Sequence, residues 1–213
     1  VAVLAEPIQG EGGIQMLTGH YLRAMREICD EHGWLLMLDV VQTGIGRTGT
    51  YFAYQGLGFT PDVVTTAKGL GTGVPIGACL ARGSAAEVLR AGQHGSTYGG
   101  NPLVCSAGLA VVGTISEQQL GANATAMGRL IADTVAADTV ASSQIREIRG
   151  RGLMLGIELV RDCGELVERG LEAGLLLNVT AGNTLRLLPP LVIDEQEART
   201  LAAGVLELIR DFA

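Results

Sequence analysis

The sequence lacks the features that would point to a membrane or a nucleic acid as a partner. Its apolar residues come in short runs broken by glycine, threonine and charges, and none approaches the roughly 18 to 20 residues of a membrane-spanning helix. Its 15 basic and 22 acidic side chains leave a net charge of -7, and the basic residues are not clustered. Binding to phosphates requires clustered lysine and arginine. We therefore expect a soluble chain that binds neither nucleic acid nor a membrane.

Metal-binding cysteine motifs are absent, and lysine is scarce. The four cysteines, Cys29, Cys79, Cys105 and Cys163, lie far apart and form neither a C-x-x-C motif nor a spacing with histidine that suits a metal. We expect no metal, and we expect reduced thiols in the core of a cytoplasmic protein. All but one of the 15 basic residues are arginine, and the exception is Lys68. The single lysine is a candidate functional residue.

Glycine, in contrast, is abundant. Its 31 copies are about twice the usual share of roughly 7%, which indicates many tight turns or close backbone approaches. Residues 44–49 read G-x-G-x-x-G, the motif that binds a dinucleotide pyrophosphate in Rossmann units. The first glycine, however, comes five residues after Asp39 rather than directly after a strand. We favour a tight loop, with nicotinamide binding as the alternative.

The first half of the chain predicts a mostly parallel α/β sheet, because short buried strands alternate with helices. The first strand opens the chain, as if its neighbours belonged to a preceding segment, so we expect a fragment of a longer protein. In such sheets ligands bind beyond the carboxyl ends of the strands, where we expect Asp39 and Lys68. The expected strands are 1–7, 35–39, 61–66 and 76–81, and the expected helices are 18–33, a short piece at 51–55, and 102–117.

A domain boundary is predicted near residue 116, because the pattern of expected helices and strands changes after this point. We expect residues 1–115 to belong to a large ligand-binding domain and residues 116–213 to form a small α+β domain. The small domain should contain helices at about 122–140 and 165–173 and strands at 146–160, 175–179 and 184–188. It should end in an amphipathic helix that turns Leu201, Val205, Leu208, Ile209 and Phe212 toward the core.

Asp39 and Lys68 suggest a particular chemistry. A lysine amine can lose its proton and attack a carbonyl, which an arginine guanidinium cannot do, although an ordinary exposed lysine in a turn is the alternative. A carboxylate at a strand end requires a cation or several hydrogen bonds, and a protonated pyridine nitrogen would supply the cation. These two contacts are what pyridoxal 5'-phosphate (PLP) requires of a protein.

Five longer motifs carry a resemblance to a known family. Over its whole length the sequence resembles the class III, PLP-dependent aminotransferases, most closely the acetylornithine and ornithine aminotransferases. The motifs are EPIQGEGG at 6–13, QTGIGRTG at 42–49, TAKGLG at 66–71, HGSTYGGNP at 94–102 and RLLPPL at 186–191. The resemblance implies part of the large domain of a fold-type I PLP enzyme, followed by its small domain.

The resemblance also implies roles for the residues around the cofactor. Lys68 would hold PLP as a Schiff base and then move a proton between substrate carbon and cofactor. Asp39 would keep the pyridine nitrogen protonated. Gln42 would hydrogen-bond the ring oxygen, and Val41 would pack on the ring face.

Further implied roles concern the partner subunit and the substrate. Ser96 and Thr97 resemble residues that reach the cofactor phosphate of a second subunit, which implies a homodimer with shared active sites. Arg186 resembles the clamp for a substrate carboxylate, and Glu11 resembles the acid that pairs with this arginine when that carboxylate is absent or must be rejected. Without the resemblance, Arg186 would be interpreted as part of an ordinary surface ion pair.

The implied reaction is transfer of the amino group of N-acetylornithine to 2-oxoglutarate, a step of arginine biosynthesis. Succinylornithine, succinyldiaminopimelate, ornithine and 4-aminobutyrate remain open as donors. Two departures from the family's pattern are visible: Val40 stands where the family usually has glutamate, and the family's N-terminal half is absent. They leave a second hypothesis, in which the chain is a non-catalytic scaffold derived from an aminotransferase.

Overall fold

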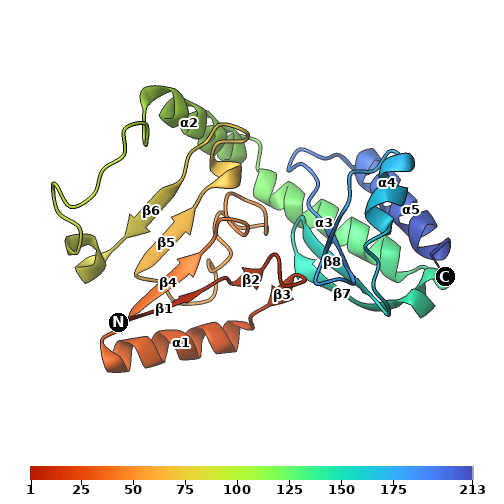
Figure 1. Ribbon diagram of the computed structural model, residues 1–213, viewed down its shortest axis with the longest axis horizontal. Coiled ribbons are helices and arrows are strands. Elements are labelled where there is room, and N and C mark those ends of the chain that lie inside the picture. The colour runs from red at the N-terminus through yellow and green to blue at the C-terminus, as the bar shows by residue number, and fades with distance from the viewer. Residues whose placement is uncertain (213) are drawn as a thin grey trace. The chain divides into compact units, whose positions relative to one another are not determined.

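The computed structural model describes residues 1–212, which fold into two compact units (Figure 1). The first unit comprises residues 1–7, 17–46 and 50–119, and the second comprises residues 8–16, 47–49 and 120 onward. The chain therefore passes between the units more than once. None of the described helices is both long and apolar enough to cross a membrane.

The first unit is built on a four-stranded sheet with the order β1-β4-β5-β6. Its strands are β1 (Ala2–Ala5), β4 (Leu35–Asp39), β5 (Val63–Thr66) and β6 (Ala78–Ala81). The first three run parallel, as expected, but β6 runs antiparallel to β5. A parallel return requires a crossover of a dozen or more residues, usually a helix. The β5–β6 connection contains only the one-turn 3-10 helix η1 (Lys68–Leu70), which explains the reversal.

Helix α1 (Gly19–His32) confirms the predicted helix at 18–33 and its end signals. The Thr18 hydroxyl caps the start by accepting from the Tyr21 amide, and Gly33 ends the helix with a left-handed φ of 64°. Leu22 and Cys29 are buried in one apolar cluster with Leu36, Leu38, Val40 and Val64. In Figure 1 the helix lies along the sheet.

The short helix expected at 51–55 is not formed, and that prediction was wrong. Residues 51–58 are turns, with Phe52 in an isolated antiparallel bridge to Gly44. Local side chains compete with the helix for the backbone groups: the Thr50 hydroxyl donates to the Phe52 carbonyl at 2.8 Å, and the Phe52 amide donates to Gln55 Oε1 at 2.9 Å. The unit ends with the 3-10 turn η2 (Gly83–Glu87) and helix α2 (Pro102–Glu117), which is capped by Asn101.

The second unit has an antiparallel sheet with the order β7-β8-β10-β9. Its strands are β7 (Ile145–Arg151), β8 (Met154–Leu159), β9 (Asn178–Thr180) and β10 (Thr184–Leu187). The single strand predicted at 146–160 is thus a hairpin, because Gly152 adopts a φ of 58° and reverses the chain. A second, shorter hairpin pairs β2 (Ile8–Gln9) with β3 (Gln15–Met16).

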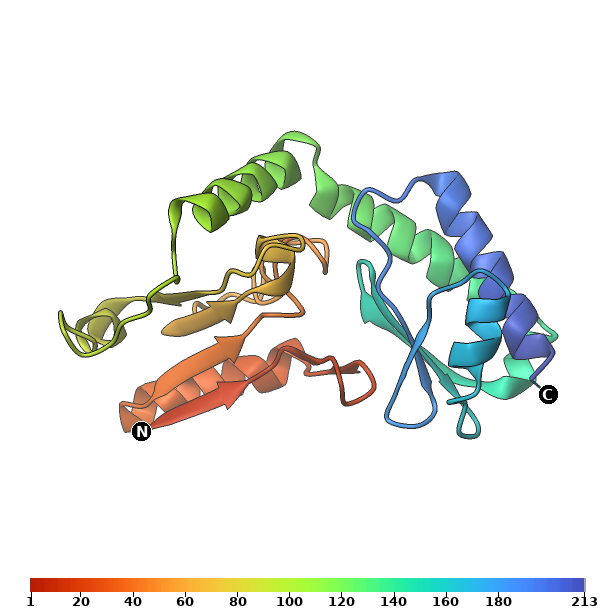
Figure 2. The ribbon, with the colours of Figure 1, turned by 45° about the horizontal axis from the view of Figure 1, so that its top comes forward.

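Three helices complete the second unit, together with the 3-10 turn η3 (Ala141–Gln144). They are α3 (Leu120–Ala136), α4 (Leu166–Glu172) and α5 (Glu195–Arg210). Helices α3 and α5 lie side by side on the sheet (Figure 2). The predicted core face of the last helix is confirmed: Val205, Leu208, Ile209 and Phe212 are buried and Leu201 packs against them.

The cysteines are less uniform than the sequence suggested. All four are free thiols; Cys29 and Cys163 are buried, but Cys79 and Cys105 are exposed. Cys79 lies on the edge strand β6, all of whose residues are exposed, and Cys105 lies in the first turn of α2. The prediction of core thiols was therefore wrong for these two. Burial raises the pKa of the Cys163 thiol to about 11.

Candidate functional site

Asp39 and Lys68 lie at the carboxyl ends of two neighbouring parallel strands. Asp39 is the last residue of β4 and pairs in register with Thr65 of β5, and Lys68 follows the end of β5 by two residues. The pairing continues one residue further, because the Val40 amide donates to the Thr65 carbonyl at 2.9 Å. The predicted placement of both residues at strand ends is confirmed, and the two strands prove to be adjacent.

The Asp39 carboxylate is half-buried and oriented by its own backbone. Its Oδ1 accepts a hydrogen bond at 2.9 Å from the amide of Val41, which closes an Asx turn. Its Oδ2 accepts no hydrogen bond from the residues that the structure describes. One oxygen thus fixes the orientation of the group, and the other is available to a cationic donor.

Lys68 stands in a strained backbone conformation. Its φ is 42°, in the left-handed region that residues other than glycine rarely adopt, and such residues concentrate at functional sites. The turn closes tightly: a Cβ on Gly71 would come within 2.1 Å of the Val74 carbonyl oxygen. The Lys68 side chain is exposed, as expected for either interpretation of the residue. Exposed turn residues such as Thr72 and Ala181 share the left-handed φ, so this conformation alone does not decide between the two interpretations.

The residues after Asp39 divide between the surface and the core. Val41 and Gln42 are half-buried, whereas Val40 is 0% exposed and packs with Leu36 and Val64. Val40 therefore belongs to the sheet's apolar core, because successive side chains of an extended strand point to opposite faces and Val40 lies on the face opposite Asp39.

The glycine-rich stretch at 44–49 is a tight loop. A Cβ on Gly44 would lie 2.7 Å from the Val40 carbonyl oxygen, so the close backbone approach requires glycine there. A dinucleotide motif must open onto a helix N-terminus, but turns follow this loop in the described chain. The interpretation as a nicotinamide site is therefore wrong.

Ser96 and Thr97 lie in an exposed segment of the first unit, before α2. The Ser96 hydroxyl accepts from the Gly99 amide at 2.9 Å, which shapes the turn into the helix. Neither side chain is hydrogen-bonded to Asp39 or Lys68 in the described chain.

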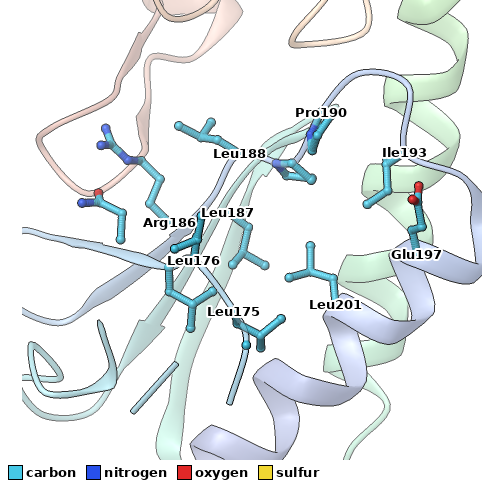
Figure 3. Close-up of a pocket in the computed structure, with 13 residues that line it drawn as sticks. Leu175, Leu176, Arg186, Leu187, Leu188, Pro190, Ile193, Glu197 and Leu201 are labelled. Carbon is cyan, nitrogen blue, oxygen red and sulfur yellow. The ribbon is translucent and has the colours of Figure 1, made fainter. Parts of the chain in front are cut away.

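In the second unit, Arg186 and Glu11 form an ion pair although 175 positions separate them. Arg186 Nη1 lies 2.7 Å from Glu11 Oε1, and the arginine side chain is only 11% exposed, against 73% for the glutamate. A guanidinium so buried is unlike an ordinary surface pair. Arg186 also borders an apolar pocket of about 660 Å³ lined largely by leucines such as Leu175, Leu187 and Leu201. Figure 3 shows the guanidinium directed away from that pocket.

Two half-buried arginines of the second unit were not predicted from the sequence. Arg47 Nη1 donates to the carbonyls of Leu153 and Pro189, and burial lowers the pKa of Arg47 to about 10. Arg149 donates from both Nε and Nη2 to the carbonyl of Gly13. The sequence does not indicate these contacts, because the carbonyl groups that accept from the two arginines lie more than 100 positions away. Among the described residues no cluster of histidine, cysteine or carboxylates could hold a metal.

Comparisons with known proteins agree on one family. Residues 1–209 match the family described as aminotransferase class-III. An acetylornithine aminotransferase of Bordetella bronchiseptica is 52% identical over 99% of this chain and 54% of its own length. The chain therefore spans about half the length of the curated relatives that it matches.

Two solved structures share the fold. The Toxoplasma gondii ornithine aminotransferase, whose structure is described as showing partial occupancy of PLP at the active site, has a TM-score of 0.93 and 34% identity over 99% of this chain and 51% of its own. An Elizabethkingia anophelis acetylornithine aminotransferase has a TM-score of 0.90 and 34% identity over 99% and 54%. The chain belongs to the class III aminotransferases, a PLP-dependent family of fold type I.

Proposed function

We propose that this chain supplies part of the active site of a transaminase that moves the amino group of N-acetylornithine to 2-oxoglutarate. The observation that carries the proposal is the placement of Asp39 and the only lysine at adjacent strand ends in a chain of this family. The 52% identical relative named acetylornithine aminotransferase supports the choice of donor. The proposed pathway is arginine biosynthesis. Residues 1–115 would belong to the large cofactor-binding domain and residues 116–213 to the small domain.

The residues at these strand ends fit PLP. PLP carries a basic pyridine nitrogen and an aldehyde on opposite sides of its ring. A protein that holds it must supply an acid for the nitrogen and an amine for the aldehyde. Asp39 Oδ2 offers an acceptor that no described residue uses, and Lys68 offers an exposed amine. Val41 and Gln42 leave part of their side chains accessible next to Asp39, which suits contacts with a ring face and a ring oxygen.

Each of these residues would have a separate task. When bound, PLP supplies an electron sink for negative charge that develops at the substrate carbon bearing the transferred amino group. The Asp39 carboxylate would hold a proton on the pyridine nitrogen by offering it a negative acceptor. Lys68 Nζ would hold the group by its aldehyde carbon, and once displaced it would carry a proton to and from the substrate carbon that bears the transferred amino group.

Arg186 and Glu11 would allow one site to accept two kinds of substrate. The planar guanidinium fork suits a carboxylate, so Arg186 would bind the carboxylate of glutamate or 2-oxoglutarate. Glu11 already pairs with it at 2.7 Å, and this pairing would satisfy the arginine when the bound donor has no carboxylate at that position. A charge as buried as Arg186 would be costly to leave without such a partner.

A homodimer with shared active sites is the proposed assembly. Ser96 and Thr97 would reach the cofactor phosphate of the second subunit, and both side chains are exposed in the chain as described. The segment that surrounds them also exposes large apolar side chains, which is typical of an interaction surface. These are Val88, Leu89, Tyr98, Leu103 and Leu109.

The proposal can be tested on the full-length protein purified with PLP. Borohydride reduction followed by peptide mapping should find a pyridoxyl-phosphate adduct on Lys68, and amino donors should change the cofactor's absorbance. Lys68→Arg keeps the charge but cannot bond the aldehyde, so it should lose both the adduct and the activity. An unmodified Lys68 would reject the proposal and leave the non-catalytic scaffold.

The same assay ranks the donors. N-acetylornithine should react with the highest kcat/KM. Ornithine is the second candidate, because an ornithine aminotransferase is among the similar structures. Succinylornithine, succinyldiaminopimelate and 4-aminobutyrate complete the comparison.

A further inference from the structure

Three residues on neighbouring strands of the second unit form a row across the sheet. Arg149 of β7 and Arg186 of β10 both pair in register with Gly156 of β8. Directly opposed residues of antiparallel strands project from the same face. The two arginines therefore flank the glycine on one face, and the gap between them is left by the absence of a side chain at position 156.

The turn between β2 and β3, residues 10–14, contacts each member of this row. Its Glu11 pairs with Arg186 at 2.7 Å. The Gly13 carbonyl accepts from Arg149 Nε at 2.9 Å and from Nη2 at 2.7 Å. Ile14 is fully buried and fills the gap, since a Cβ on Gly156 would lie 3.0 Å from the Cβ of Ile14.

Arg149 is itself held rigidly. Its side chain is 7% exposed, and Nη1 donates to Glu158 Oε2 at 2.6 Å and to Glu147 Oε2 at 2.8 Å. The hydrogen bond from Arg149 to Glu158 is the main reason that the pKa of Glu158 lies below its ordinary value, so the carboxylate that anchors the arginine stays charged. The guanidinium fork is thus fixed on one side by carboxylates and presents its other side to Gly13.

The turn is strained where it is anchored. Ile14 has a φ of 58°, a left-handed conformation that is costly for a β-branched residue. The chain retains this conformation because Ile14 is buried with Ile8 and Met154 while Arg149 holds the preceding carbonyl. Glu11 consequently stands on a turn whose position is fixed by packing and by two hydrogen bonds.

We propose that Arg149 and Gly156 are positioning residues that hold Glu11 against Arg186 and thereby set the enzyme's preference between its two kinds of substrate. The inference rests on the proposed function. The carboxylate of glutamate must displace Glu11 from Arg186. N-acetylornithine places no carboxylate at this position, so Glu11 must stay paired with Arg186 when it binds. Loosening the turn therefore favours glutamate, and it disfavours N-acetylornithine by leaving a buried guanidinium without its partner.

The test uses the full-length holoenzyme and measures each half-reaction separately by the change in cofactor absorbance in single turnovers. Arg149→Gln removes the hydrogen bonds to Gly13. Gly156→Ala keeps every charge but crowds Ile14, because its Cβ would also lie 3.1 Å from Ile14 Cγ1 and 3.1 Å from Thr184 Cγ2, which limits a shift of the new side chain away from the turn. Arg146→Gln is the matched control: Arg146 lies on the same strand and pairs with Glu158, but it is 57% exposed and has no hydrogen bond to the turn.

In both test variants the single-turnover efficiency, which is the maximal rate constant divided by the apparent Kd, should rise at least tenfold for glutamate relative to N-acetylornithine, with a lower apparent Kd for glutamate. The control should keep the wild-type ratio. An unchanged ratio, or equal losses in both half-reactions, would overturn the positioning role. If the Arg149→Gln protein does not fold, the substrate ratio of the Gly156→Ala protein alone tests the positioning role. A wild-type enzyme that reacts with neither donor would instead reject the proposed function.

Discussion

Val40 stands where the family usually carries glutamate, and its surroundings explain why valine is suitable here. The side chain is 0% exposed and packs among Leu36, Leu38 and Val64. A carboxylate placed there would be buried without a cation. We expect Val40→Glu to destabilise the folded protein by about 3 kcal/mol, because an uncompensated buried charge costs this much or more.

The measurement is the midpoint of thermal unfolding of the full-length protein. Val40→Ala is the control, since it removes packing without adding charge and should cost about 2 kcal/mol. A Val40→Glu protein as stable as the wild type would mean that a polar partner for this position exists and that the apolar account is wrong.

Asp62 links helix α1 to the sheet and gives stability a defined pH dependence. Its Oδ2 accepts from Arg26 Nη1 at 2.6 Å and from the Leu36 amide at 2.8 Å. Burial alone would raise the pKa of Asp62, but these hydrogen bonds and the charges of Arg26 and Arg82 bring the pKa below its ordinary value. The folded pKa is lower than the unfolded one, so the contribution to stability is present above about pH 4 and is lost as the pH falls through the folded pKa.

Asp62→Asn should therefore lower the free energy of unfolding near neutral pH by about 1 to 2 kcal/mol, since a largely buried guanidinium loses one of its two carboxylate partners and keeps Asp30. The difference from the wild type should shrink as the pH falls below about 4, because the carboxylate is then protonated in the unfolded chain and, at still lower pH, in the folded protein as well. Denaturant unfolding at a series of pH values measures both effects. The exposed pair of Arg129 and Asp133 supplies the control: Asp133→Asn should change nothing measurable. A constant difference at all pH values would contradict the assignment to Asp62.

At the scale of elements, two helical glycines predict opposite effects of the same substitution. A Cβ on Gly128 of α3 would lie 1.9 Å from the carbonyl oxygen of Gly152, in the β7–β8 turn, so helix and turn touch backbone to backbone. A Cβ on Gly113 of α2 would meet only the Glu117 carboxylate, at 3.8 Å. Gly128→Ala should cost about 3 kcal/mol because the backbones must separate, whereas Gly113→Ala should stabilise by about 0.5 to 1 kcal/mol through helix propensity.

Thermal unfolding of the two variants side by side tests this pair. Both variants replace glycine with alanine, so a difference between their unfolding midpoints must come from the different surroundings of the two positions. A Gly128→Ala protein as stable as Gly113→Ala would show that α3 does not touch the turn.

Local signals in the sequence predicted the elements well where the cause is local. Thr18 and Gly33 mark the ends of α1 because a hydroxyl cap and a left-handed residue act within one helical turn. The apolar run ending at Asp39 predicted both a buried strand and a candidate site at its end. The direction of β6 and the hairpin at 145–159 were missed, because strand pairing is decided by connection length and by a single glycine's φ.

Some residues of the candidate site could be predicted from the sequence, and others could not. Asp39 and Lys68 could be found from strand ends and residue chemistry, and the ion pair of Glu11 with Arg186 followed from motifs of the family. Arg149 could not be found, because its partner Gly13 lies 136 positions away and offers only a carbonyl oxygen. Every residue has a backbone carbonyl, so the residue type does not show which carbonyl will accept a hydrogen bond. Contacts of this kind can be identified only in the folded structure.

At the scale of the whole molecule, the proposed shared active site makes a prediction about mixed dimers. If Lys68 of one subunit works with Ser96 and Thr97 of the other, a Lys68→Ala protein and a Ser96→Ala/Thr97→Ala protein should each be nearly inactive. Co-expression with two different affinity tags allows the mixed dimers to be compared with each parent. One of the two sites in a mixed dimer then has an intact Lys68 and an intact partner loop, because both defects fall in the other site.

Random pairing should make half of the dimers mixed, so the total activity should recover to about a quarter of the wild-type value, and purified mixed dimers should reach about half. If all three residues acted within one subunit, every site in the mixture would carry a defect and no activity would return. The number of subunits alone cannot separate these cases, since both would be dimers of equal mass. Recovery of activity in the mixed dimer is therefore the result that distinguishes a shared site from two independent ones.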